Sequence, residues 1–232
     1  MNDIAASQKT AFYQMIKAFH DVNALDHIII IGSWAEYIYE ESNQLNFVAA
    51  LKTQDIDILV PNINRPVEKI DLVQVLEKEG FESRRSSDGL VKFDKDGQID
   101  VEFLVREIGK GKMEPYKVNS LGVMAQGLRN MEILTDHTIV VNIKGFNVTV
   151  PKPAAYILHK LVINEERKPE YKQEKDINAV KGLVAVAKGT TLKNDMNTIY
   201  NTLTTKQQKK IINTCKKWDI ELSKNLQAGM VR

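Results

Sequence analysis

Hydrophobic and polar residues alternate with two different periods along the first half of the chain. Apolar residues recur every three or four positions over residues 7–22, which predicts an amphipathic helix there. A short apolar run over 27–31 predicts a buried strand, and helical spacing returns over 33–42. Further along, the pattern predicts a strand at 56–60, a helix at 67–78, and strands at 81–85, 90–93 and 99–105.

The pattern changes at residue 151. Before it, two alternating segments at 138–143 and 146–150 predict a hairpin around Lys144-Gly145. After it, helices are predicted at 154–167, at 172–187, and as one or two segments between 193 and 224. We therefore expect an α/β (α+β) protein with a mixed sheet flanked by helices. Its catalytic domain would span residues 1–150, and a helical C-terminal domain would span residues 151–232.

Composition narrows the class of protein. The chain has 232 residues and a net charge of +2, so overall charge gives no reason to expect nucleic-acid binding. A single cysteine, Cys215, excludes an internal disulfide framework and a cysteine-based zinc site. The N-terminus lacks a signal-peptide pattern, and no apolar stretch is long enough to span a bilayer. We expect a cytoplasmic protein without a membrane partner.

Two aspartates stand one residue apart at the start of the second predicted strand. In Asp55-Ile56-Asp57 the two carboxylates share one face of the strand, about 7 Å apart, and Ile56 points the other way. Neighbouring carboxylates repel each other, and a divalent cation between them removes that repulsion. Magnesium takes oxygen ligands and usually shares them with substrate phosphates. The pair therefore indicates phosphoryl or nucleotidyl chemistry.

A third acid lies on the predicted strand at 99–105, where Asp100 and Glu102 share one face. If this strand pairs beside Asp55-Ile56-Asp57, the strands lie about 4.8 Å apart and Asp100 completes a cluster of three carboxylates. Such a cluster can hold two metal ions roughly 3.5–4 Å apart.

A Gly-Ser pair, Gly32-Ser33, joins the first apolar strand to a helix. Glycine lets the backbone approach a phosphate, and the amides that open a helix favour negative charge. Each motif is common by itself, since Gly-Ser is also a helix cap and acids often line the exposed face of a strand. Their conjunction in this order is much less common.

The order of these motifs resembles that of the nucleotidyltransferase fold, the superfamily of DNA polymerase β. The string Thr53-Gln54-Asp55-Ile56-Asp57 resembles most closely the bacterial minimal nucleotidyltransferases, a group that includes toxins of abortive-infection systems. Twenty-one residues separate Ser33 from Asp55, a longer stretch than the family pattern. A longer helix or an inserted loop at 40–52 would absorb the excess.

The resemblance implies a role for each matched residue. Gly32 and Ser33 would contact phosphate, while the metal ligands and catalytic acids would be Asp55, Asp57 and Asp100. Asp100 is preferred to Glu102 because the family's third acid opens this strand segment.

In the helical half, the resemblance implies two further site residues. Lys160 would contact the triphosphate, and Asp176 would either accept a proton from the attacking hydroxyl or hold Lys160 or Arg167 in place. Alternatively, Lys160 is a lysine that reaches water from an amphipathic helix, and Asp176 is an ordinary helix charge.

The expected activity is a magnesium-dependent transfer, with a two-ion site, of a nucleoside monophosphate from an NTP such as ATP. The acceptor would be a hydroxyl or phosphate on the 3′ end of a tRNA, on a protein side chain or on a small molecule, and pyrophosphate would leave. The resemblance also implies a cognate antitoxin as a partner. The alternative is a catalytically inactive module that binds a nucleotide or a partner protein. Retention of three mutually repelling acids argues against that alternative.

Overall fold

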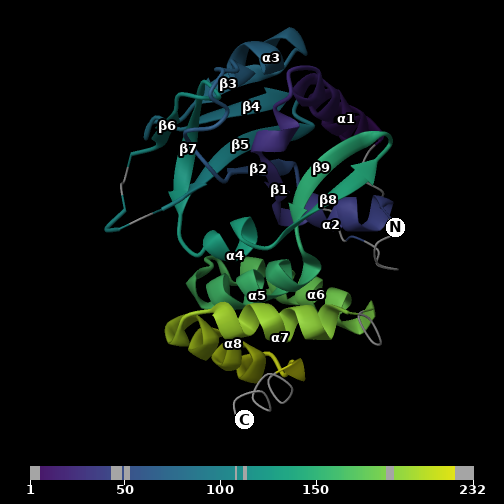
Figure 1. Ribbon diagram of the computed structural model, residues 1–232, viewed down its shortest axis with the longest axis vertical. Coiled ribbons are helices and arrows are strands. Elements are labelled where there is room, and N and C mark those ends of the chain that lie inside the picture. The colour runs from purple at the N-terminus through teal and green to yellow at the C-terminus, as the bar shows by residue number, and fades with distance from the viewer. Residues whose placement is uncertain are drawn as a thin grey trace.

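A mixed β-sheet lies between two groups of helices in the computed structural model (Figure 1), which describes residues 6–42, 49, 53–107, 109–111, 114–186 and 191–222. Helices α1 (Ala6–Asp21) and α3 (Leu72–Lys78) lie at one end of the molecule, beside the sheet. Helices α4 (Glu132–Thr135), α5 (Pro153–Ile163), α6 (Glu170–Val186), α7 (Leu192–Thr202) and α8 (Thr205–Lys217) lie at the other end.

The central strands carry the sequence motifs. Strand β1 (Ile29–Ile31) pairs antiparallel with β2 (Asp55–Val60), and β2 pairs parallel with β5 (Ile99–Arg106). The other edge of β5 is divided between two strands. Strand β4 (Val91–Lys95) pairs with its first half, and β7 (Val123–Leu128) pairs with its second half. Strands β3 (Glu82–Arg85) and β6 (Tyr116–Val118) extend β4 and β7.

The two faces of this sheet differ in chemistry. Alternation sends Ile56, Ile58, Val101 and Phe103 to the face that joins the main hydrophobic core. The opposite face carries the acids of β2 and β5. It becomes apolar further along the strands, where a smaller buried cluster packs under α4; its members are Ile29, Ile31, Leu59, Leu104, Met131 and Leu134.

Helix α2 (Gly32–Glu41) and a separate hairpin pack against the end of β1. The hairpin consists of β8 (Thr138–Ile143) and β9 (Phe146–Pro151), as the alternating pattern predicts, and it forms its own two-stranded sheet. The Tyr39 hydroxyl of α2 donates a 2.6 Å hydrogen bond to the carbonyl of Pro151. Trp34 is fully buried and stacks on Phe12 with ring centroids 4.5 Å apart.

The helical region is built around α5. Proline at its first position favours helix initiation, and residues 154–162 are all buried. Helices α6, α7 and α8 pack against it, and their apolar residues join the same core as the sheet. The end of β9 coincides with the predicted boundary at 151, and the division into two domains stays a prediction. Within the described residues, no helix is both long and apolar enough to cross a membrane.

The structure differs from the predicted elements in two places. Helix α3 begins at Leu72 instead of residue 67, because the amides of Ile70 and Leu72 bond to the carbonyls of Ser120 and Leu121 and the Asp71 side chain caps the helix. Strands β6 and β7 fall in a stretch to which the sequence pattern assigned no strand.

Candidate active site

The register of β1 and β2 brings the Gly-Ser turn to the Asp-x-Asp strand. Ile31 is paired with Asp57, so Gly32, the next residue, lies directly beside the Asp57 carboxylate. Gly32 has φ = +67°, and a Cβ atom there would lie 2.3 Å from Oδ2 of Asp57. Glycine is therefore required at this position for two reasons: the left-handed backbone and the close approach of the carboxylate.

Helix α2 starts at Gly32, and no described side chain caps its N-terminus. The amides of its first turn have no partner within the helix, and they carry the positive end of the helix dipole. Ser33 is buried and lines the cavity that these amides face. The helix start therefore provides a site for an anionic oxygen next to Asp57.

Four carboxylates lie in two cross-strand pairs on one face of the sheet. The parallel register of β2 and β5 places Asp55 opposite Asp100 and Asp57 opposite Glu102. Burial, together with the charge of Glu102 and a side-chain hydrogen bond to it, raises the pKa of Asp57 to about 7. In the absence of a cation, Asp57 therefore holds a proton up to near-neutral pH.

Lys92 is a counter-charge to two of these acids, Glu102 and Asp55. It projects from β4 onto the carboxylate face, where its Nζ lies 2.8 Å from Oε2 of Glu102 and 4.0 Å from Oδ1 of Asp55. The side chain is about two-fifths exposed, so it can turn away toward water. Lys92 therefore partly neutralises the cluster in the absence of a metal.

The helical region supplies the wall opposite the carboxylates. Asp176 of α6 accepts hydrogen bonds from Lys160 Nζ of α5, at 2.5 Å, and from Arg167 Nε, at 2.9 Å. Burial alone would raise the pKa of Asp176, but Lys160 and Arg167 outweigh it and hold the pKa below its ordinary value. Such a carboxylate is a weak base, which favours the holding role over proton transfer.

These groups surround a cavity of about 450 Å³. Besides Lys160 and Arg167, two further basic side chains of α6 line it, Lys172 and Lys175. Burial and then the positive charge of Lys160 lower the pKa of Lys175, so the cations on this wall repel one another. A polyanion in the cavity would relieve that repulsion.

A buried acid connects the two walls. Glu36, one turn along α2 from Gly32, accepts a hydrogen bond from the Tyr156 hydroxyl of α5. Burial raises the pKa of Glu36, while the hydrogen bond from Tyr156 lowers it. Lys160 is one turn beyond Tyr156 on α5, and its Nζ lies 5.3 Å from the Tyr156 ring centroid. The Glu36–Tyr156 contact therefore fixes α5 over the start of α2.

The donor set fits a hard divalent cation, although no group of three described acidic, histidine or cysteine side chains converges as a ready-made metal site. Magnesium is usually held by one or two carboxylates together with substrate phosphates and water. Asp57 and Glu102 supply such a pair beside a cavity lined by basic groups. Lys92 is the only basic side chain with an ion pair to Glu102 among the described residues, and the raised pKa of Asp57 shows that Asp57 is not fully compensated.

Most of the site residues predicted from the sequence line this one cavity: Gly32, Ser33, Asp55, Asp57, Lys160 and Asp176. Asp100 lies on the same face, opposite Asp55, but outside the cavity lining, whereas Glu102 is part of it. The alternation in Asp100-Val101-Glu102 indicated that both acids share a face. Alternation alone does not determine the register between β2 and β5, and the register decides which of the two acids faces Asp57.

The sequence pattern did not predict three residues of the site: Lys92, Glu36 and Lys172. Lys92 and Glu36 have no motif, since each becomes part of the site only through pairing between distant segments. Lys172 precedes Lys175 by three residues on one helix, a spacing that places both on the same face. Most of the predicted insertion at 40–52 lies outside the described residues.

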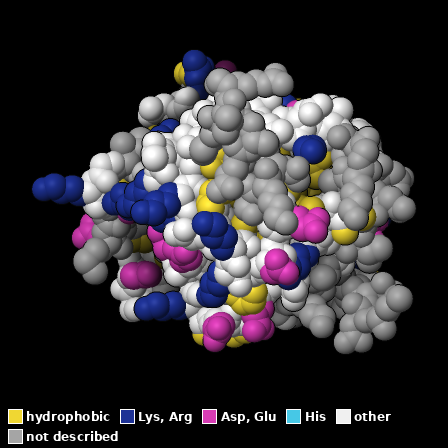
Figure 2. All heavy atoms as spheres, turned by 90° about the horizontal axis from the view of Figure 1, so that it is seen from below, with side chains coloured by type: hydrophobic (Ala, Val, Ile, Leu, Met, Phe, Trp, Pro, Cys, Tyr) yellow, Lys and Arg dark blue, Asp and Glu magenta, His cyan; other side chains and the backbone are white. Residues whose placement is uncertain are grey.

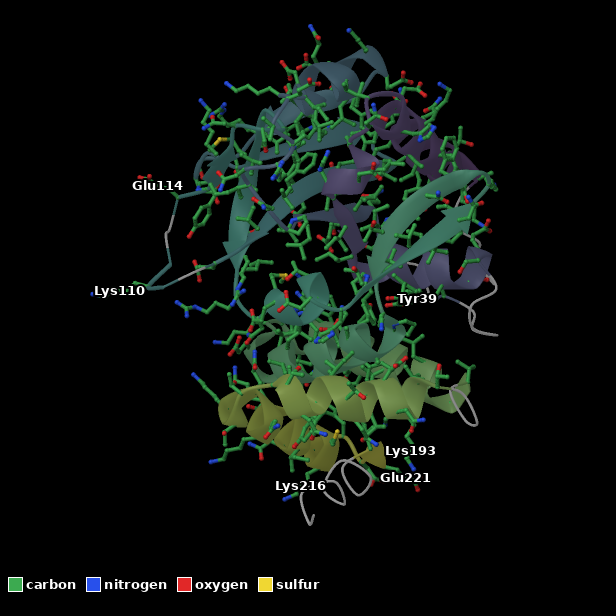
Figure 3. All side chains as sticks on the ribbon, viewed as in Figure 1. Tyr39, Lys110, Glu114, Lys193, Lys216 and Glu221 are labelled. Carbon is green, nitrogen blue, oxygen red and sulfur yellow. The ribbon has the colours of Figure 1, made fainter. Side chains whose placement is uncertain are left out.

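Among the described residues, no basic side chain of α8 lines this cavity. Lys216 projects from the end of the molecule opposite the sheet, near Lys193 and Glu221 (Figure 3). Seen from that end, lysine and arginine side chains are interspersed with acidic ones (Figure 2). Lys210, for example, pairs with Glu166. The face is therefore one of mixed charge.

Comparisons with known proteins identify the family. The chain matches a nucleotidyltransferase family over residues 10–205. It matches no curated protein. A similar solved structure is an antigenic nucleotidyltransferase-like protein from Paracoccidioides brasiliensis, with 14% identity and a TM-score of 0.52, covering 94% of this chain and 92% of that one.

Two structures of the antibiotic-resistance factor ANT(2″)-Ia are also similar, each with 15% identity. The crystal structure in complex with adenylyl-2″-tobramycin has a TM-score of 0.49 and covers 84% of this chain and 98% of that one. The solution structure has a TM-score of 0.43 and covers 97% and 91%. At such identities the likeness concerns the fold alone. The family match spans most of the chain, and the protein therefore belongs to the nucleotidyltransferase family and is an enzyme of that class.

Proposed function

We propose that this enzyme binds an NTP in the cavity between α2 and α6 and transfers its nucleoside monophosphate to an acceptor hydroxyl or phosphate. The observation that carries the proposal is the position of Asp57. It lies against Gly32 at the start of α2, opposite Glu102, and faces a wall of four basic side chains. Acids and cations on opposite walls suit a metal-bound polyphosphate between them.

The triphosphate would be held from both sides. The free amides of α2 and the Ser33 hydroxyl would bind oxygens on one side, and Lys160 with Arg167 would bind them on the other. Lys172 and Lys175, at the outer part of the same wall, would attract the nucleotide and neutralise its terminal phosphate. These groups supply charge and orientation and do not react covalently.

The carboxylates of β2 and β5 would hold the cation. Mg²⁺ bound there would neutralise phosphate charge and lower the pKa of the attacking hydroxyl. Asp57 and Glu102 are the central pair in this proposal, because they face each other and both line the cavity. Asp55 would complete the set, and Asp100, opposite Asp55, would contribute from the outer edge. A two-ion site remains part of the proposal.

The bond changes follow from this arrangement. The acceptor oxygen forms a bond to the α-phosphorus, and the bond from that phosphorus to the oxygen bridging the α- and β-phosphates breaks. Pyrophosphate leaves, and where the acceptor is a hydroxyl its proton passes to solvent water. Asp176 acts as a positioning residue that holds Lys160 and Arg167 toward the phosphates. The candidate acceptors are a tRNA end, a protein side chain and a small molecule, while a toxin-like role with an antitoxin partner stays a prediction.

Calorimetric titration with each of the four NTPs tests the proposal. We expect binding of at least one NTP that is much tighter with Mg²⁺ than with EDTA, and loss of that metal dependence in Asp57→Asn. Incubation with α-labelled NTPs and cell extract should then leave label on an acceptor. Metal-independent binding with no transfer of label would contradict the proposal.

A further inference from the structure

A buried acid on α2 lies one helical turn behind the proposed phosphate site. Glu36 is four residues beyond Gly32, so both residues lie on the same face of α2. Glu36 is 4% exposed, and it is the one charged residue in a stretch, residues 33–39, that is buried throughout. Burying a carboxylate costs free energy unless the carboxylate is hydrogen-bonded, so the position of this acid depends on its partner.

The partner of Glu36 is a tyrosine at the matching position on α5. The hydroxyl of Tyr156, a fully buried residue, donates a hydrogen bond to Oε1 of Glu36. Burial, and then the charge of Glu36, raise the pKa of Tyr156 well above its ordinary value, so the hydroxyl keeps the proton that this bond requires. Lys160 is four residues beyond Tyr156 and therefore lies on the same face of α5.

These spacings make the Glu36–Tyr156 hydrogen bond a link between the two sides that would hold the triphosphate. Gly32 opens the α2 side and Lys160 belongs to the α5 side, and each is one turn, about 6 Å along its helix, from the link. The ammonium of Lys160 also lies 5.3 Å from the centroid of the Tyr156 ring. Among the described residues, no other side-chain hydrogen bond joins α2 to α5. A shift of the Tyr156 hydroxyl would therefore move Lys160 relative to Gly32.

Charge alone does not explain an acid at this position. Burial raises the pKa of Glu36 overall, whereas the hydrogen bond from Tyr156 and then the charges of the nearby lysines act in the opposite direction. Those lysines are Lys160 and Lys175, which line the cavity, and Lys160 is already paired with Asp176. A further negative charge close to them weakens their attraction for phosphate. The hydrogen bond is the feature that remains to be explained.

An apolar pair could fill the same space. Replacing both members of a buried hydrogen bond by apolar groups of similar shape is often nearly neutral or stabilising. Apolar contacts, however, are non-directional, whereas a hydrogen bond fixes both the distance and the angle between donor and acceptor. A buried polar pair of this kind therefore contributes a defined geometry more than it contributes stability.

We propose that Glu36 and Tyr156 are positioning residues for the nucleotide, because their hydrogen bond sets the distance between Lys160 and the start of α2. That distance decides whether the amides of α2 and the ammonium of Lys160 can contact one triphosphate at the same time. The inference rests on the proposed function.

Removing the hydroxyl tests the link. Tyr156→Phe keeps the ring beside Lys160 and leaves Glu36 without its donor, and we expect at least tenfold weaker binding of the NTPs in calorimetric titration with Mg²⁺. Tyr39→Phe is a matched control. Tyr39 is buried on the same helix, and its hydroxyl donates to the carbonyl of Pro151, where the β8–β9 hairpin meets α5 (Figure 3). This control should also lose stability, and it should keep the NTP affinity of the wild type.

Two substitutions of Glu36 separate the hydrogen bond from the charge. Glu36→Gln removes the charge and keeps an oxygen that can accept from Tyr156, whereas Glu36→Ala removes both. We expect about a tenfold loss of NTP affinity in Glu36→Ala and recovery of most of that loss in Glu36→Gln. Equal losses in the two variants would mean that Glu36 acts through its charge, and they would overturn the role given to the hydrogen bond.

A double variant separates positioning from stability. Glu36→Leu/Tyr156→Phe replaces both polar groups by apolar ones, so its free energy of unfolding in urea should return toward the wild-type value, even if the single variants fold poorly. Its NTP affinity should stay at least tenfold below that of the wild type, because the distance between α2 and α5 is no longer fixed. Recovery of NTP affinity together with stability would mean that the pair is purely structural.

The wild-type enzyme separates this inference from the proposed function. If the wild type binds an NTP with Mg²⁺ and both Tyr156→Phe and Glu36→Ala bind it equally well, the positioning role is wrong and the proposed function stands. If the wild type binds none of the four NTPs with Mg²⁺, the proposed function itself is wrong.

Discussion

Gly32 leaves the space that the Asp57 carboxylate occupies, since a Cβ atom on residue 32 would lie 2.3 Å from Oδ2 of Asp57. Gly32→Ala should therefore push the Asp57 carboxylate away from the start of α2. We expect at least a tenfold loss of NTP affinity in calorimetric titration. We also expect a loss of stability of about 1–2 kcal/mol from the left-handed backbone alone, with a further loss from the clash.

Gly97→Ala is a matched control for that variant. Gly97 has φ = +68°, nearly the same as Gly32, and a Cβ atom there would meet nothing within 4 Å. Gly97→Ala should lose the stability that an alanine in a left-handed backbone conformation loses, without any change in NTP affinity. Equal NTP affinities in the two variants would mean that the contact between Gly32 and Asp57 does not shape the site.

Glu102 and Asp100 offer a direct comparison of two acids on one strand. Glu102 faces Asp57 and lines the cavity, and Asp100 faces Asp55 outside the lining. Glu102→Gln should reduce transfer of labelled nucleotide by about a hundredfold to a thousandfold, the range for losing one preorganised charged group. Asp100→Asn should reduce it by about tenfold or less. A larger loss of transfer in Asp100→Asn than in Glu102→Gln would mean that Asp100 is the central third acid, as the family resemblance implies.

This comparison also shows where sequence reasoning reaches its limit. Local patterns identified β2, the strand carrying Asp100, and the helix carrying Lys160, because alternation and helical spacing are properties of short segments. The same patterns placed Asp100 and Glu102 on one face. Which acid faces Asp57 depends on the register between β2 and β5, which long-range packing sets.

Long-range packing also explains why the sequence pattern did not predict strand β7 or the site residues Lys92 and Glu36. Strand β7 contains Gly127 and weak alternation, and it becomes a strand through pairing with the second half of β5. Lys92 reaches Glu102 because β4 lies beside β5, and Glu36 reaches Tyr156 because α5 packs on α2.

Stability of the metal-free protein should depend on pH through Asp57. Its pKa is about 7 in the folded state, against an ordinary value of 3.8. The folded state therefore holds a proton that the unfolded chain releases, so this contribution to stability is complete below pH 3.8 and is lost as the pH rises to about 7. Asp57→Asn should be increasingly stabilised relative to wild type over that range.

Urea unfolding in EDTA at several pH values between about 4 and 8 measures this difference. Asp26→Asn, at an exposed position away from the site, serves as the control. A free-energy difference between Asp57→Asn and wild type that does not change with pH would mean that Asp57 does not hold this proton in the folded state.

Lys92→Met should tighten metal binding. Lys92 Nζ lies 2.8 Å from Glu102, where it competes with a cation for the same carboxylate. The side chain is partly exposed, so the effect should be modest, about twofold to fivefold in apparent Mg²⁺ affinity. Magnesium titrations at a fixed NTP concentration measure it, with Lys117→Met on β6 as the control. A weaker Mg²⁺ affinity in Lys92→Met would mean that Lys92 helps to hold the nucleotide.

Asp176→Ala should destabilise the free enzyme strongly and the nucleotide-bound enzyme much less. The variant leaves Lys160, whose side chain is 9% exposed, and Arg167 without their shared partner. Removing one member of a buried ion pair typically costs about 3–5 kcal/mol, because the remaining charge is left uncompensated. An NTP bound in the cavity would give both cations a new partner, so ligand-induced stabilisation should be larger in the variant than in wild type.

Unfolding by urea with and without a saturating NTP measures this ligand-induced stabilisation. The double variant Lys160→Met/Asp176→Leu removes both buried charges of that pair and leaves only Arg167, which is 39% exposed, so it should regain much of the stability and show a smaller NTP response than Asp176→Ala. A proton-transfer role for Asp176 predicts the opposite pattern for the single variant: near wild-type stability, an unchanged NTP response, and loss of transfer alone.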